Sequence, residues 1–179
     1  MNTQLIDIRE MQPGEIPRVS EIVCAGYRWL AEQAGYPSGQ LADMIAHRGS
    51  ERAIREQCES YQFLVATRDS RILGVVGIEH AEVTKLFVDP SSLREGIGTA
   101  LFRAAEEAIM KAGHGMLFLG AFGPSMPFYE AMGLSADHEK TIDCGPLRGR
   151  RNTVMKKSLG GYQANPAALS QHCVDERIR

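Results

Sequence analysis

The residues best placed to do chemistry form a glycine-rich segment that follows one predicted strand and begins a predicted helix. The segment reads Leu93-Arg94-Glu95-Gly96-Ile97-Gly98-Thr99-Ala100. The first backbone N–H groups of a helix have no intrahelical partner and the helix dipole favours negative charge, so an anion is expected to bind there. Gly96 and Gly98 lack a Cβ and let phosphate oxygens approach the backbone, while the Thr99 hydroxyl adds a donor. The alternative is a glycine-rich helix start that binds no ligand.

Two other phosphate-binding motifs do not fit these residues. A Rossmann fingerprint needs a third glycine or alanine three residues after the second, and Leu101 occupies that place. The loop of the P-loop nucleotide hydrolases ends in Gly-Lys-Ser or Gly-Lys-Thr, which this segment lacks. A phosphate-bearing cofactor of another kind remains the leading interpretation.

Strongly patterned elements flank this segment. Residues 83–88 predict a β-strand that ends at Asp89-Pro90, because proline restricts the residue before it and cannot donate to a sheet. Apolar residues at helical spacing predict a helix over 101–112, ended by Gly113. Residues 116–122 are almost all apolar, which predicts a strand buried on both faces. Together these elements predict a β-α-β unit with two parallel strands and a right-handed crossover.

The rest of the chain supplies shorter elements around this unit. The pattern predicts strands over 5–9, 61–67, 72–80, 136–143 and 150–157, and helices over 16–30, 41–47, 51–59 and 125–132. Residues 68–71 join two of these strands as the turn of a hairpin, so those strands should be antiparallel. Gly35 should end the first helix, and the segment 36–60 is weakly patterned.

The bulk composition limits the class of protein. With 179 residues, 44% hydrophobic and 23% charged, the chain is expected to form one domain with a substantial core. A formal net charge of −2 gives no basic footprint, so nucleic acid is not an expected partner. No run approaches the roughly 18 apolar residues of a membrane helix, and residues 1–10 lack a signal-peptide pattern. We therefore expect a soluble, cytoplasmic protein without a membrane partner.

Cysteine and histidine do not suggest covalent or metal chemistry. The four cysteines are widely spaced and form no C-x-x-C pair, and the histidines show no metal-ligand spacing. Cys144 and the other thiols have no neighbouring histidine motif that would create a nucleophile. We expect reduced thiols and no metal.

Three motifs within residues 83–134 carry a family resemblance. They are Lys85-Leu86-Phe87-Val88-Asp89-Pro90, the segment Arg94 to Leu101, and Pro127-Phe128-Tyr129-Glu130-Ala131-Met132-Gly133-Leu134. In this order and spacing they resemble the GNAT superfamily of acetyl-CoA-dependent N-acetyltransferases. The resemblance implies an α/β acyl-CoA N-acyltransferase fold, whose mixed, mostly antiparallel sheet is splayed around a central β-α-β acetyl-CoA-binding unit. It implies one domain over residues 1–159 and a C-terminal tail over 160–179.

The resemblance also implies how acetyl-CoA would bind as co-substrate. The backbone of Phe87 and Val88 would pair with the pantetheine amides, and the Val88 N–H would polarise the thioester carbonyl. The pyrophosphate would be held by the N–H groups of Arg94, Glu95, Gly96, Ile97, Gly98 and Thr99. Family members usually carry Gln or Arg where this chain has Leu93. Arg94 is either a substitute phosphate ligand or a solvated side chain.

The same resemblance suggests an acid and a base for amine acetylation. Presenting a protonated alkyl amine in its neutral form costs about 4 to 5 kcal/mol at neutral pH, so a base is worthwhile. Glu82 is the expected base, with Glu79, His80 or water as alternatives. Glu79 and His80 lie on the preceding predicted strand and therefore face opposite sides. Tyr129 matches the family's helix tyrosine, which lies near the CoA sulfur as a proton donor, although aromatic packing would also explain it.

The acceptor is predicted only as a class. The resemblance implies direct attack by a primary amine of a small molecule, or of a peptide, in a ternary complex, and a homodimer is possible. Arg148, Arg150 and Arg151 form a basic cluster that would suit an acidic acceptor or simply be solvated. Trp29, Tyr36 and Met44 would line the acceptor side or pack in the core. Two non-enzymatic alternatives stay open: a catalytically silent acyl-CoA-binding or regulatory domain, and a structural protein that binds nothing.

Overall fold

The computed structural model describes residues 5–160, and the predicted tail therefore lies almost entirely outside the described residues. The strands are β1 (Asp7–Glu10), β2 (Gln62–Arg68), β3 (Arg71–Glu79), β4 (Glu82–Val88), β5 (Met116–Ala121), β6 (Ser135–Thr141) and β7 (Arg151–Ser158). The helices are α1 (Ile16–Ala34), α2 (Ser38–Met44), α3 (Glu51–Gln57), α4 (Ile97–Lys111) and α5 (Met126–Ala131). Every predicted helix and strand within the described residues is present, with ends shifted by a few residues.

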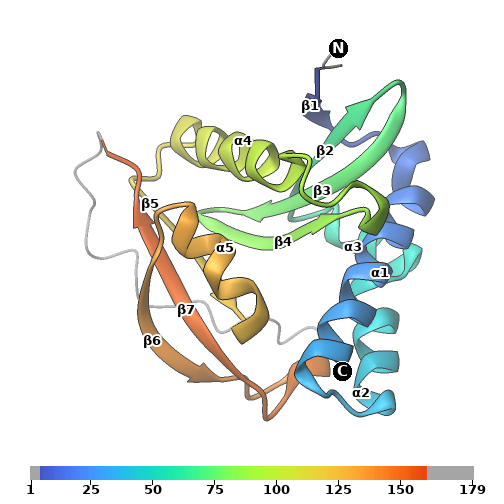
Figure 1. Cartoon of the computed structure of the whole chain (residues 1–179), viewed down its shortest axis with the longest axis vertical. Coiled ribbons are helices and arrows are strands. Elements are labelled where there is room, and N and C mark those ends of the chain that lie inside the picture. Colours follow the sequence, from blue (N-terminus) through green and yellow to red (C-terminus); the bar gives the residue numbers. More distant parts are fainter. Residues whose placement is uncertain (1–4, 161–179) are drawn as a thin grey trace.

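The strands form one seven-stranded sheet in the order β1-β2-β3-β4-β5-β7-β6. All neighbouring pairs are antiparallel except β4 and β5, which are parallel and share a single register pair, Glu82 with Phe118. Beyond this pair the two strands diverge, and Figure 1 shows β5, β6 and β7 turning away from β4. The predicted mixed, mostly antiparallel, splayed sheet is confirmed.

Tight turns set the register of the β2-β3-β4 meander. Asp69 and Ser70 both have positive φ, 51° and 63°, as the two central residues of a type I′ hairpin require. His80 also has a positive φ, 53°, because it lies in the turn between β3 and β4. The prediction that His80 faces one side of a strand is therefore wrong: only Glu79 of that pair is in β3.

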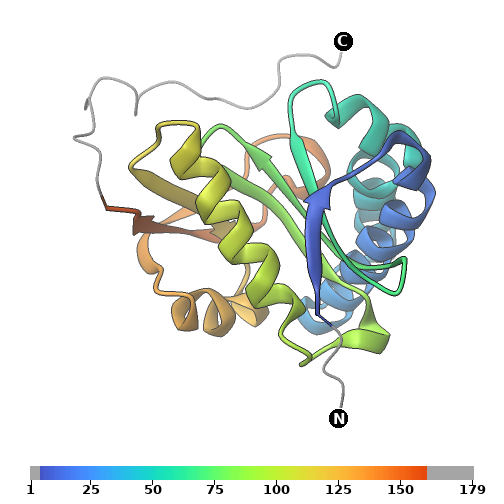
Figure 2. The same cartoon turned by 90° about the horizontal axis from the view of Figure 1, so that it is seen from above.

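Two apolar clusters cover the opposite faces of β2 and β3. One joins Leu64 and Val76 to Leu101 and Phe102 of α4, and the other joins Val65 and Val75 to α1. Residues that alternate along the strands therefore enter different cores, as the two-residue period of a strand dictates. Figure 2 shows the consequence, with α4 and the group α1–α3 on opposite sides of these strands.

Helices α1–α3 do not cover β5, β7 and β6, so one face of β5 is left partly exposed. Leu117, Leu119 and Ala121 are buried against the α4 cluster, but Gly120 on the other face is exposed. The prediction that β5 is buried on both faces is wrong, because a continuous apolar run cannot reveal which helices reach it. No helix in the described part of the chain is long and apolar enough to span a membrane.

Candidate active site

The N-terminus of α4 presents free backbone donors beside the end of β4. The first intrahelical bond runs from the Ala100 N–H to the Gly96 carbonyl, at 3.0 Å, so the preceding N–H groups lack helical acceptors. Gly96 has φ of 80° and Arg94 has φ of 64°, so left-handed residues alternate with others along the loop. Successive N–H groups in such a conformation converge into an anion-binding concavity. The geometry fits the predicted phosphate site.

Side chains hold this loop in place from both ends. Asp89 accepts a hydrogen bond from the Ser91 N–H at 2.9 Å and pairs with Arg18 of α1. Glu95 pairs with Arg68 of β2 at 2.6 Å, which makes it an anchor of the loop. Leu93 is 56% exposed and offers no polar group at the position where the resemblance leads one to expect Gln or Arg. Arg94 is also exposed and forms no ion pair with another residue of 5–160, so its side chain is available to an anion.

Gly98 lies where the start of α4 meets β4 and α5. A Cβ at this position would contact Phe128 of α5 at 3.5 Å and Val88 of β4 at 3.6 Å, which is ordinary van der Waals distance. Alanine would therefore fit, but a larger side chain would compete with Phe128 and Val88 for the same space. The structure thus brings together Gly98, Val88 and the helix that carries Tyr129.

The edge of β4 that faces β5 has unpaired backbone groups. The Asp89 N–H donates to the Leu73 carbonyl of β3 at 2.8 Å, and Phe87 pairs with Val75 of β3. Because N–H and C=O groups alternate sides along a strand, Leu86 and Val88 direct theirs toward the split between β4 and β5. This placement favours Val88 and Leu86 as partners of an extended ligand, and Leu86 was not among the predicted residues. The Phe87 ring instead packs against Tyr27, with ring centroids 5.0 Å apart.

Glu82 lies at the closed end of this split, where β4 and β5 still pair. Burial raises the pKa of the Glu82 carboxyl, and the nearby Glu79 raises it further, while Arg48 and Lys140 act in the opposite direction. A carboxylate with a raised pKa is a stronger base. Glu79 is directly opposite Glu82 in the β3–β4 pairing, which explains its effect on the Glu82 carboxyl.

Tyr129 belongs to an aromatic group on the α4 side of the split. Its ring lies 5.2 Å from the Phe128 ring and 6.1 Å from the Phe102 ring, measured between centroids. Burial raises the pKa of Tyr129 to about 12. A phenol with this pKa is a weak acid, so it is better suited to donating a hydrogen bond to a leaving thiolate than to transferring its proton fully.

The α1–α2 loop and α2 contact the loop before β7. Arg150 lies over the Tyr36 ring, 4.2 Å from its centroid, and its Nε donates to Gln40 at 2.7 Å. Tyr36 in turn meets Phe122, at 6.3 Å between centroids. Arg150 is therefore committed to this contact. Met44 is fully buried and belongs to the core, whereas Trp29 is 46% exposed.

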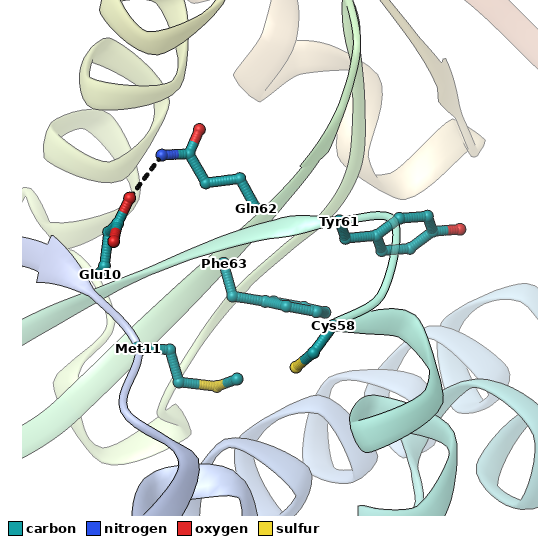
Figure 3. Close-up of a pocket in the computed structure, with 6 residues that line it drawn as sticks. All are labelled: Glu10, Met11, Cys58, Tyr61, Gln62 and Phe63. Atoms are coloured by element: carbon teal, nitrogen blue, oxygen red, sulfur yellow. Dashed lines mark hydrogen bonds between the residues drawn. The ribbon is translucent and has the colours of Figure 1, made fainter.

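A pocket of about 220 Å³ lies apart from the split, at the start of β2, as shown in Figure 3. Its lining residues are Glu10, Met11, Cys58, Tyr61, Gln62 and Phe63. Gln62 donates to Glu10 at 2.9 Å across its rim, and the Tyr61 hydroxyl points away from Met11 and Cys58. Burial raises the pKa of the Cys58 thiol, which makes it a poorer nucleophile. This pocket contains none of the predicted site residues.

Within residues 5–160 no three His, Cys, Asp or Glu side chains gather as a metal site.

The splayed sheet, the open edge of β4 and the helix α4 that follows it define an acyl-CoA N-acyltransferase type of fold. The chain belongs to the GNAT acetyltransferase family, whose acetyltransferase (GNAT) domain matches residues 33–158.

Solved structures with low sequence identity share this fold. A GCN5-related N-acetyltransferase from Rhodopseudomonas palustris is 22% identical, with a TM-score of 0.75 over 88% of this chain and 98% of that one. The PaiA N-acetyltransferase of Thermoplasma acidophilum, solved in complex with coenzyme A, is 21% identical, with a TM-score of 0.69 over 86% and 99%. The putative acetyltransferase yncA of Salmonella typhimurium, solved with acetyl-CoA, is 15% identical, with a TM-score of 0.63 over 91% and 99%.

Proposed function

We propose that this protein transfers an acetyl group from acetyl-CoA to a primary amine of a small molecule, by direct attack within a ternary complex. The observation that carries the proposal is the unpaired edge of β4, which leads directly into the free N–H groups at the start of α4. An extended chain with amides and a terminal pyrophosphate matches this sequence of donors and acceptors. Family membership and the coenzyme A bound by two structural neighbours support the choice of cofactor.

The backbone of β4 supplies the contact that activates the thioester. Leu86 and Val88 both face the split, but Leu86 is two residues, roughly 7 Å, closer to Glu82 along the strand. We therefore assign polarisation of the thioester carbonyl to the Leu86 N–H and pairing with the pantetheine arm to Val88. The expectation from the sequence was different: it gave pairing with the pantetheine amides to Phe87 and Val88, and polarisation of the thioester carbonyl to Val88.

Glu82 acts on the acceptor amine and Tyr129 on the leaving thiolate. Glu82 accepts a proton from the acceptor ammonium, directly or through water, and its raised pKa makes this transfer less unfavourable. The neutral nitrogen then attacks the carbonyl carbon, the C–S bond breaks, and the second proton that the nitrogen loses as the amide forms passes, directly or through water, to the departing thiolate. Tyr129 donates a hydrogen bond to the departing sulfur, which needs only about 2 kcal/mol of help at neutral pH because of the low pKa of a thiol.

The test is acetyl-CoA-dependent release of free thiol across a panel of small amines, together with thermal shifts by acetyl-CoA and CoA. Gly98→Val should abolish both the shift and the turnover, because its side chain fills the space between Phe128 and Val88. Gly14→Val is the matched control, since no atom lies within 4 Å of a Cβ at Gly14. Stabilisation by CoA without transfer to any amine would instead identify a silent acyl-CoA-binding domain. Absence of any stabilisation would contradict both functions.

A further inference from the structure

Two cations and two phenols gather on the α1 side of β4. The Arg48 Nε donates to the Tyr27 hydroxyl at 3.3 Å, and the Lys85 Nζ lies 5.8 Å from the centroid of the Tyr61 ring. Lys85 is 3% exposed, and its Nζ has no hydrogen-bond partner of normal geometry among residues 5–160. We call these four residues the Arg48 cluster.

The cluster has an excess of positive charge that the described structure does not balance. Elsewhere, partly buried cations pair with carboxylates, as Arg18 does with Asp89 and Lys157 with Glu106. Neither Arg48 nor Lys85 has a carboxylate within ion-pair distance among residues 5–160. Burial alone would raise the pKa of the Tyr27 phenol, yet Lys85 and Arg48 together lower it. Two uncompensated cations at a partly buried position favour an anion from outside the described chain.

The position of Arg48 connects this charge to the reacting centre. On one side it binds Tyr27, whose ring packs against Phe87 in the middle of β4. On the other side it is close enough to Glu82 to lower the pKa of that carboxyl. Arg48 therefore lies beside β4, on the face opposite α4, near both Glu82 at the start of the strand and the Tyr27–Phe87 contact further along it.

We infer that the acceptor amine also carries an anionic group. This group binds the Arg48 guanidinium, and the nearby Lys85 ammonium adds a second positive charge to the site. This inference rests on the proposed acetyl transfer and narrows its acceptor to amines with a second, negatively charged end. Nε of Arg48 is occupied by Tyr27, and its terminal nitrogens make no hydrogen bond to the described residues. Two adjacent N–H groups on a guanidinium match the two oxygens of a carboxylate, which makes an aminocarboxylate the primary candidate.

The experiment measures the ratio of kcat/KM for two amines of the same chain length, 4-aminobutyrate, which ends in a carboxylate, and butylamine, which ends in a methyl group. An aminoalkyl phosphate is added to distinguish carboxylate from phosphate. The wild-type protein should favour an anionic acceptor by roughly tenfold or more, the effect of one charge-assisted hydrogen bond. Arg48→Gln should reduce this ratio toward one, and Lys85→Met should reduce it partly. Arg52→Gln is the matched control, because Arg52 is exposed and pairs only with Glu56 one turn further along α3.

The outcomes separate this inference from the proposed function. Transfer that does not favour the charged acceptor, or a preference that survives in Arg48→Gln, overturns the inference and leaves acetyl transfer intact. Preference for the aminoalkyl phosphate over 4-aminobutyrate supports an anionic acceptor but replaces the carboxylate by a phosphate. Thermal stabilisation by CoA without transfer to any acceptor contradicts the proposed function, and the inference falls with it.

Discussion

Replacing Lys85 by methionine should stabilise the protein at neutral pH. Burial lowers the pKa of Lys85 from its usual 10.5 to about 8, with Arg48 acting in the same direction and Tyr27 opposing the shift. The ammonium is therefore less stable in the folded chain than in the unfolded chain. Methionine has a similar shape, no charge and no need for a hydrogen-bond partner.

The size and sign of the effect follow from proton linkage. A shift of about 2.5 pKa units corresponds to about 3 kcal/mol. Because the folded-state pKa is below the unfolded-state value, the unfolded chain binds more protons between pH 8 and 10.5, and wild-type stability rises with pH in that window. Lys85→Met has no titrating group at this position, so its stability does not depend on pH in this way. Its free energy of unfolding should exceed that of wild type by about 3 kcal/mol at pH 7 and by about 1 kcal/mol at pH 9.5.

Urea unfolding followed by circular dichroism at these two pH values measures the difference. Lys111→Met is the control, because Lys111 is 80% exposed and its pairing with Glu107 is a surface contact. The control should stay within about 0.5 kcal/mol of wild type at both pH values. A wild-type protein more stable than Lys85→Met at pH 7, or a difference independent of pH, would refute the reasoning.

Three further substitutions test the loop, the base and the acid. Gly96→Ala should lower the unfolding free energy by about 1 to 2 kcal/mol, because φ is 80° there, whereas Gly14→Ala should be nearly neutral; equal losses in urea titrations would exclude backbone strain. In a pH–rate profile, wild-type turnover should rise as Glu82 loses its proton, with a midpoint above the usual carboxyl range because the pKa of Glu82 is raised. Glu82→Gln should remove this rise, and an unchanged profile would eliminate Glu82 as the base. Tyr129→Phe should lower kcat by about tenfold, the value of one hydrogen bond to a charged group, and leave the CoA-induced thermal shift unchanged; equal turnover would remove the acid role.

The part of the site built from local sequence could be predicted. The donors at the start of α4 follow from a glycine segment at a strand–helix junction, and Gly35, Gly113 and Gly133 end helices with positive φ as their positions suggest. These features depend on neighbours in the chain, so periodicity and turn chemistry are enough to find them. The confirmed splay between β4 and β5 came from the family resemblance rather than from any local pattern.

The Arg48 cluster could not be predicted, because its members come from four separate elements. Arg48 lies in a π-type turn, Ile45–Gly49, within the weakly patterned segment, and its partner Tyr27 follows the apolar spacing of α1, which gives no sign of a polar contact. One local signal was available: Lys85 is a charged residue that directly precedes the apolar run Leu86-Phe87-Val88 of β4. The side to which it points depends on a register shift between β3 and β4 at Gly77 and Ile78, which breaks the simple alternation.

Because β4 is open on the side of β5, backbone amides in the middle of the sheet lack a strand partner, as they would at an edge strand. The amides of Phe87 and Asp89 are hydrogen-bonded to β3, while those of Leu86 and Val88 have no strand opposite them. Hydrogen–deuterium exchange along this one strand should therefore alternate between slow and fast amides, residue by residue. The same feature means that a bound pantetheine arm acts as a short missing strand, so its amides would close the seam between the two halves of the sheet and join them into one cooperative unit.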